Sequence, residues 1–131
     1  MKSEVIETKG AKLWLEDGIF HSETHPNAEM DLGLAREHLK IHAKLTGGKK
    51  TPVLTDIRTI KSIDRDARRH LSGEEAEKIH TVLALLVTSP VSKVIGNFFM
   101  AINKPRFPSR MFNSEEKATA WLKSFLEQEE N

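Results

Sequence analysis

Residues 53–69 read VLTDIRTIKSIDRDARR, and the fold class follows from this stretch. Its first residues are apolar and rich in β-branched side chains, which predicts a short strand ending at Asp56. After a brief turn, Asp64 is placed to cap a strongly basic helix. A strand followed closely by a helix is the repeating unit of parallel α/β sheets.

The chain before this stretch predicts a hairpin and a helix. The hairpin is AKLWLEDGIFHSE at residues 11–23, in which Asp17-Gly18 suits the positive φ angles of a tight turn. The helix is expected over residues 29–45, because its apolar side chains recur at helical spacing. Asn27 or Asp31 is expected to cap it.

The chain after this stretch continues the alternation of helices and strands. Ser72 begins a Ser-x-x-Glu pattern that predicts the cap of a short helix. TVLALLV at residues 81–87 is apolar at nearly every position, which is typical of a parallel strand buried on both faces. Ser89-Pro90 predicts the start of a further helix, with proline at its first position.

The last elements are a short strand, SRMF at residues 109–112, and a helix capped by Asn113 or Ser114. The predicted order is therefore β-β-α-β-α-β-α-β-α. This order predicts one layered α/β domain over residues 1–131, with its core in 11–127. The sheet is expected to be mostly parallel, with about five strands and an antiparallel N-terminal hairpin.

The composition excludes several classes of function. With 20 Lys and Arg against 19 Asp and Glu, the net charge of +1 lacks the positive excess of nucleic-acid-binding proteins. The absence of cysteine excludes disulfides and thiolate metal sites. The longest apolar run, Val82–Val87, is too short for an integral membrane segment, and the first residues lack the apolar segment of a secretory signal. We therefore expect a cytoplasmic protein.

Residues 97–122, NFFMAINKPRFPSRMFNSEEKATAWL, carry a family resemblance. This segment is similar to bacterial SpoIIAA-like proteins, and the element order over 11–127 resembles the STAS fold. The resemblance implies a regulatory module that binds a protein partner. The family's phosphorylated Asp-Ser-Ser/Thr-Gly turn is replaced here by TIKSIDRD at residues 59–66. Ser62 or Thr59 would then be the residue to be phosphorylated.

Basic residues gather at the joint between the strand and the helix of the opening stretch. They are Arg58, Lys61, Arg65, Arg68 and Arg69. Open α/β sheets bind ligands at the carboxyl ends of their strands, where helix N-termini offer free N–H groups. The joint is therefore a candidate site for an anion or a protein partner, with Lys104, Arg106 and Arg110 expected nearby. The alternative is a solvated charged helix, whose surface ion pairs contribute about 0–1 kcal/mol each.

Two histidines and two apolar residues are candidates for lining a pocket. His38 and His42 lie four residues apart inside the apolar arc of the predicted 29–45 helix. They are interpreted as pocket residues or hydrogen-bonded core residues; no third ligand accompanies them, so no metal or other cofactor is expected. In the helix expected over residues 90–103, Phe99 lies at the edge of the core face and Met100 on the far side. These two residues are expected to form a partner or homodimer surface, or a lid over an apolar cavity.

The core face of that helical segment is expected to carry five apolar residues: Val91, Val94, Ile95, Phe98 and Ile102.

Neither a Gly-x-Ser-x-Gly motif nor a phosphate-binding glycine loop occurs, so an enzyme is not expected. The sequence favours a non-enzymatic regulatory or protein-interaction module of STAS/SpoIIAA-like type. Its partner, a protein or a small anionic ligand, would bind at the joint over residues 56–69. The alternative is a small-ligand or lipid carrier that resembles the CRAL-TRIO carriers and makes peripheral membrane contact.

Overall fold

The structure is a computed structural model that describes the backbone of residues 1–130 and the side chains of residues 1–128. The strands are β1 (Ile6–Glu7), β2 (Ala11–Glu16), β3 (Ile19–Thr24), β4 (Glu29–Met30), β5 (Thr51–Asp56), β6 (Ser62–Ile63), β7 (His80–Leu86) and β8 (Ser109–Phe112). The helices are α1 (Leu32–Thr46), α2 (Arg65–Ser72), α3 (Glu74–Glu77), α4 (Pro90–Phe98), the π-helical turn η1 (Phe99–Asn103) and α5 (Glu115–Glu130).

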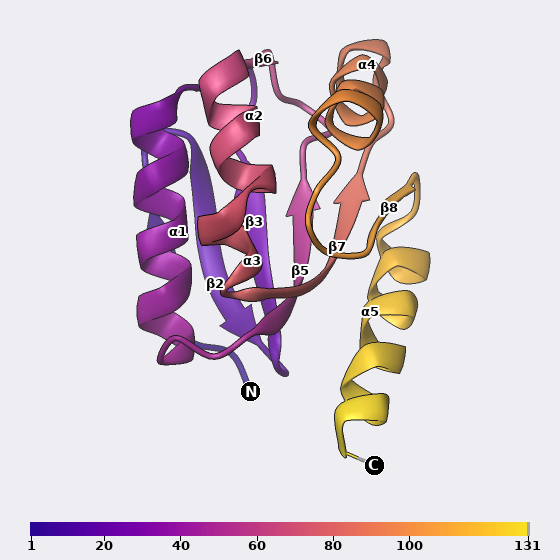
Figure 1. The fold of residues 1–131 in the computed structure, drawn as a ribbon. Helices are drawn as coiled ribbons and strands as arrows, with labels where there is room; N and C mark the ends of the chain where they lie inside the picture. Colours follow the sequence, from indigo (N-terminus) through magenta and orange to yellow (C-terminus); the bar gives the residue numbers. More distant parts are fainter. Residues whose placement is uncertain (131) are drawn as a thin grey trace.

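The main sheet has the strand order β1-β2-β3-β5-β7-β8 (Figure 1). The first three strands pair antiparallel, and β3, β5, β7 and β8 run parallel to one another. The prediction of a mostly parallel sheet with an N-terminal hairpin is confirmed. A sixth strand, β1, was not predicted, because two residues are too few to give a periodic pattern.

The hairpin turns where the sequence predicts. Asp17 and Gly18 both have positive φ angles, 51° and 82°, which is the geometry of the two-residue turn that suits twisted strands. The central strand β7 is also as predicted, since from Val82 to Leu86 every residue is buried.

Helix α1 begins three residues later than predicted, because residues 29 and 30 form a strand of a separate two-stranded sheet. Glu29 and Met30 form β4, which pairs in parallel with Ser62 and Ile63 of β6. Asp31 is the cap of α1, and its carboxylate accepts a hydrogen bond of 2.8 Å from the Leu34 amide.

The predicted cap at Ser72 is wrong. Ser72 is the last residue of α2, and its buried hydroxyl donates a hydrogen bond of 2.8 Å to the Arg68 carbonyl. The following helix, α3, is a single turn with Gly73 before it and no side-chain cap. The capping pattern is local, whereas this serine is already inside a helix that packs against the core.

The helices cover the two faces of the sheet unequally. Figure 1 shows α1 and α2 side by side over one face, with α5 apart from them. On that first face the core includes residues of β2, β3, β5, β7, α1, α2 and η1. Among the described residues, α5 is the helix that contributes to the core on the second face, and its fully buried residues are Ala118 and Leu122.

Candidate functional site

The joint between β5 and α2 is a fixed structure. The segment that leads into α1 binds it through backbone hydrogen bonds: the Asn27 amide donates to the Thr59 carbonyl at 2.8 Å, and the Lys61 amide donates to the Ala28 carbonyl at 2.9 Å. Ile57 and Ile60 anchor the joint from below and are 1% and 4% exposed. The backbone of the joint is therefore held by hydrogen bonds and by two buried side chains, and its polar side chains project from this backbone.

The basic side chains of the joint differ in how they are paired. Arg58 donates two hydrogen bonds, of 3.0 and 2.8 Å, to the carboxylate of Asp56, and this interaction raises the pKa of the guanidinium. Lys61 lies 3.5 Å from Glu29. Arg65 and Arg69 are exposed and form no ion pair among the described residues. They are the cations of the joint left available to a partner.

The N-terminus of α2 is already bound by a carboxylate of the protein itself. Asp64 accepts a hydrogen bond of 2.8 Å from the Ala67 amide, and Asp66 follows in the first turn. A free anion at this helix end would meet both carboxylates. This end of α2 is therefore occupied by the protein's own carboxylates rather than open to a small anion.

The second basic loop lies at the other end of the sheet. It precedes β8, so the topology places it at the amino ends of the parallel strands. There the Arg106 amide donates to the Ser72 carbonyl at 3.2 Å, and the Arg106 guanidinium lies 3.9 Å from Glu77. Arg110 lies over the ring of Phe112, 5.1 Å from its centre. The expectation that this loop adjoins the start of α2 is therefore wrong for Arg106 and Arg110, whereas Lys104 directly follows η1, which contacts α2.

Thr59 and Ser62 both have exposed side chains at the joint. Ser62 lies in β6, with Glu29 opposite it. Phosphorylation at either residue stays a prediction.

Helix α4 shows the largest difference from the sequence analysis. Phe98, assigned to the core, is 49% exposed, whereas its neighbour Phe99 is 6% exposed. Met100, expected on the far side, is partly buried and packs against the core. The predicted core face is thus turned outward over most of its length. The large exposed apolar residues of α4 and η1 are Val91, Val94, Phe98 and Ile102.

The reason for this orientation lies on the opposite side of the helix. Ser92 and Gly96 are small, four residues apart and buried, so the backbone of α4 can approach the sheet closely. A Cβ atom on Gly96 would lie 3.0 Å from the Met111 methyl carbon. Ile95 and Phe99 enter the core beside this contact. The small-residue spacing was the signal available in the sequence, and hydrophobic periodicity alone missed it.

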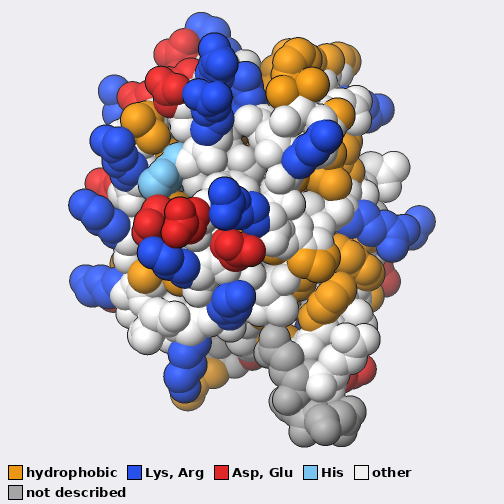
Figure 2. Space-filling model, viewed as in Figure 1, with side chains coloured by type: hydrophobic (Ala, Val, Ile, Leu, Met, Phe, Trp, Pro, Cys, Tyr) orange, Lys and Arg blue, Asp and Glu red, His pale blue; other side chains and the backbone are white. Residues whose placement is uncertain are grey.

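The exposed apolar residues of α4 form one surface with the joint. Figure 2 shows hydrophobic side chains gathered over α4, next to Lys and Arg side chains over α2. Arg68 connects the two, because its guanidinium lies 5.7 Å from the centre of the Phe98 ring and also donates to the Ile63 carbonyl. We call this the α2–α4 surface, made of residues 56–69 and the exposed residues of α4 and η1.

A cavity of about 70 Å³ lies on the inner side of α4, between the sheet and the helices. Phe99, His38 and His42 line it, whereas Met100 does not. Most of its wall is aliphatic or aromatic. The polar side chains of the wall are Ser22, Thr24, Thr55, His38, His42 and His80. Within the described residues, no charged side chain lines this cavity.

His42 and His80 form an aromatic cluster at one end of the cavity. His42 is 1% exposed, stacks on Phe20 with ring centres 4.1 Å apart, and has Nε2 2.8 Å from the Thr51 hydroxyl. Its Nδ1 atom is buried and has no hydrogen-bond partner among the described residues. His80 has Nδ1 2.8 Å from the Ala76 carbonyl, so Nδ1 carries the proton and Nε2 is an acceptor. Burial lowers the pKa of His42 to about 3 and the pKa of His80 to about 4.

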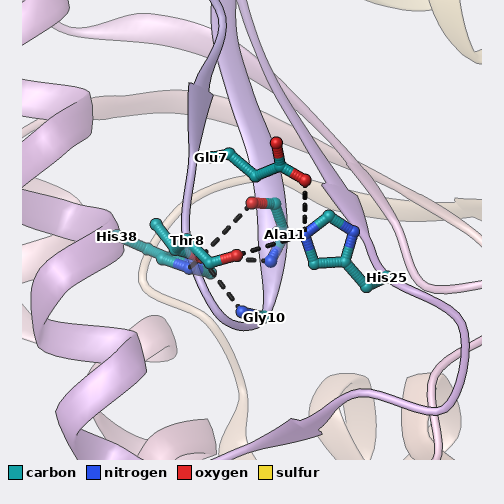
Figure 3. A network of polar contacts seen from close by, with 6 residues as sticks. All are labelled: Glu7, Thr8, Gly10, Ala11, His25 and His38. Carbon is teal, nitrogen blue, oxygen red and sulfur yellow. Dashed lines mark hydrogen bonds and ion pairs between the residues drawn. The ribbon is translucent and has the colours of Figure 1, made fainter.

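His38 is held by Thr8 (Figure 3). The Thr8 hydroxyl oxygen accepts hydrogen bonds of 3.1 Å from the amides of Gly10 and Ala11. Its own proton has two acceptors within reach, His38 Nε2 at 2.8 Å and the Ala11 carbonyl at 3.3 Å. Burial lowers the pKa of His38 to about 4. His25 joins the same network, with Nε2 3.1 Å from the Thr8 carbonyl.

His80 and Thr8 were not singled out in the sequence. A histidine beside a continuous apolar strand was the signal for His80, whereas nothing local connects Thr8 with a residue thirty positions away. Within the described residues, no group of three His, Asp or Glu side chains is placed to hold a metal ion. Among the described residues, no helix is both long enough and apolar enough to cross a membrane.

The fold is SpoIIAA-like, which confirms the resemblance seen in the sequence. A crystal structure of an uncharacterized protein of the DUF3478 family, with a SpoIIAA-like fold, from Shewanella loihica PV-4 is 14% identical; it has a TM-score of 0.52 and covers 92% of this chain and 93% of its own. An anti-sigma factor antagonist from Mycobacterium paratuberculosis is 12% identical, with a TM-score of 0.61 and coverage of 94% and 95%. At this identity the likeness concerns the fold alone.

The chain belongs to the family described as Domain of unknown function (DUF7793), whose profile matches residues 13–126. Among curated proteins, none matches this chain.

Proposed function

We propose that this protein is a non-enzymatic regulatory module of the STAS/SpoIIAA-like type, and that a protein partner docks on its α2–α4 surface. The observation that carries the proposal is the outward apolar face of α4. Val94 is 58% exposed and Ile102 is 68% exposed, although a helix of this composition would ordinarily bury such residues. A contiguous exposed apolar surface bordered by polar residues is typical of protein interfaces. The anti-sigma factor antagonist fold supports a protein partner.

The charge around this face indicates the chemistry of the partner. Residues 90–103, which form α4 and η1, contain one basic residue, Lys93, and no acidic one. Lys93 is exposed on α4, and Arg65 and Arg69 are exposed on the neighbouring α2. Complementary charge steers association and selects partners. The partner is therefore a protein with an apolar patch, such as one face of a helix, bordered by Asp or Glu.

A protein fits this surface better than an anionic membrane does. The joint carries Asp64 and Asp66 beside Arg65, and Glu29 beside Lys61. An anionic bilayer attracts clusters of one sign and repels the interspersed carboxylates. A protein can place a matching charge opposite each of them.

The test is site-specific photo-crosslinking in the native host, with a photoreactive phenylalanine analogue in place of Val94. The same analogue at Lys123 on α5, on the opposite face of the sheet, is the control. A discrete protein crosslinked at position 94 alone would be identified by mass spectrometry and purified. Its affinity would then be measured by titration calorimetry against the full-length chain.

We expect Phe98→Ala and Arg65→Glu each to weaken this affinity at least about tenfold, because central apolar anchors and complementary charges dominate interfaces. Lys123→Glu should leave it unchanged. Crosslinks only to a second copy of the chain would replace the proposal with a homodimer, and crosslinks only to lipid would replace it with membrane contact. A partner whose affinity ignores both substitutions would also overturn it.

A further inference from the structure

We infer that the cavity lined by His38, His42 and His80 is a binding site for a small, linear, uncharged molecule with an apolar body and one hydrogen-bonding group, such as an alcohol or a primary amide. This site lies on the inner side of α4, whereas the exposed apolar residues of the α2–α4 surface lie on its outer side; Ile57 and Ile63 of the joint also line the cavity. The inference rests on the shape, the polarity and the charge of the cavity wall.

The shape of the cavity favours a linear molecule. Its wall on β7 extends from His80 to Leu85, which is about 16 Å at about 3.3 Å per residue. The combination of a lining of this length with a volume of only about 70 Å³ favours a slender ligand over a bulky one. Aliphatic side chains such as Ile57 and Ile95 surround one end of it.

The polarity of the wall is not that of an ordinary core. Ser22 and Thr55 face each other in register on β3 and β5, and both line the cavity. Thr24, two residues further along β3, is 5% exposed, and its hydroxyl already donates a hydrogen bond of 2.9 Å to the Asp56 carbonyl. Buried polar groups destabilise a protein unless they are hydrogen-bonded, and ligand sites are mostly apolar with a few polar groups that orient the ligand. Ser22 and Thr55 are placed to orient such a group.

The imidazoles add a second set of hydrogen-bonding groups at one end. Thr8, Thr51 and the Ala76 carbonyl fix His38, His42 and His80 respectively. Nε2 of His80 is an acceptor, because Nδ1 donates to the carbonyl. The side chain of His42 is 99% buried and one of its ring nitrogens has no partner. Rings held in this way form a preorganised wall.

The charge of the wall selects an uncharged ligand. Of the described residues, none that lines the cavity is Asp, Glu, Lys or Arg. The three histidines are neutral at physiological pH, since burial lowers their pKa values well below 6.5. A carboxylate or an ammonium group would enter without a counter-charge, which is costly in a buried site.

The test uses three probes of equal length: 1-butanol, butyrate and butylammonium. Each is titrated into the ¹⁵N-labelled full-length protein at neutral pH, and the amide shifts are followed by NMR. We expect 1-butanol to cause saturable shifts at Ser22, Thr55 and Leu83, with a millimolar dissociation constant typical of a ligand with so few atoms. The two charged probes should cause no saturable shift there.

Two variants locate the site. Thr55→Val removes one hydroxyl at similar shape and should weaken 1-butanol binding about fivefold. Leu85→Phe fills the cavity and should abolish binding, whereas Leu54→Met, on the opposite face of the sheet, should not alter it. Absence of saturable 1-butanol binding to the wild-type protein would overturn the inference. Binding that survives Leu85→Phe, or butyrate binding as tight as that of 1-butanol, would do the same.

Discussion

The two faces of the central sheet differ in what they bury. Among the described residues, the buried side chains of the face under α5 are all apolar: they are Ile19, Leu54, Val82, Ala84, Leu86, Ala118 and Leu122. The other face, under α1 to α4, contains a cavity and six polar side chains on the cavity wall. One strand supplies both environments, since Leu54 points to α5 and Thr55 points to the cavity. The face under α5 is therefore packed for stability. The opposite face is less completely packed and holds polar groups at fixed positions.

Lowering the pH should have the largest effect, and it should act through the cavity face. The pKa values of His38 and His80 are lowered to about 4 and that of His42 to about 3, against 6.5 for an unperturbed histidine. Below pH 6.5 these histidines bind protons in the unfolded chain but not in the folded chain. The free energy of unfolding is therefore highest above pH 6.5 and falls as the pH is lowered toward the pKa values of the folded protein. Each histidine costs about 1.4 kcal/mol per pH unit, and the three together about 4 kcal/mol.

Urea denaturation at about pH 7.5 and about pH 5.5 measures this loss. The variant His42→Leu should show a pH dependence smaller by about one third. Equal free energies of unfolding at the two pH values would show that these histidines are not buried as neutral groups.

Matched truncations should separate the two faces further. Leu122→Ala, on the fully packed face, should lower the free energy of unfolding by about 4 kcal/mol, whereas Leu85→Ala, beside the cavity, should lower it by about 2 kcal/mol. The difference arises because Leu85 already borders a void and loses fewer contacts. Thermal or chemical denaturation of both variants measures it. A larger loss for Leu85→Ala would contradict the distinction between the faces.

The smallest effect is expected on the outer side of α4. Phe99→Ala should destabilise the protein by about 3 kcal/mol, because this ring is buried in the cavity face. Phe98→Ala should lower the free energy of unfolding by less than about 1 kcal/mol, since its ring is half exposed and makes a cation–π contact with Arg68. Comparing the two denaturation midpoints tests the orientation of the helix. The reverse order would place Phe98 in the core, as the sequence pattern predicted.

Some features of the candidate sites could be predicted from the sequence and others could not. The positions of His38, His42 and Phe99 on one cavity wall were anticipated from the apolar arc of one helix and the edge of another. The grouping of the two basic loops was not correct for Arg106 and Arg110, because a loop that leads into a parallel strand lies at the amino ends of the strands, whereas the 56–69 joint follows the carboxyl end of β5. The link from His38 to Thr8 depends on how the N-terminal strands meet α1, which no local pattern contains.

The sequence by itself determined the main helices and strands and several of their ends, although not the two-residue strands β1, β4 and β6. Asp17-Gly18 specifies a hairpin turn, Asp31, Asp64 and Ser89 cap helices, and the apolar run of β7 specifies a central strand, because these signals act through the local backbone and through burial. Only the tertiary structure decided which side of α4 faces the core. That helix has two apolar sides, and the close approach of Gly96 to Met111, from a strand that follows later in the chain, selects between them.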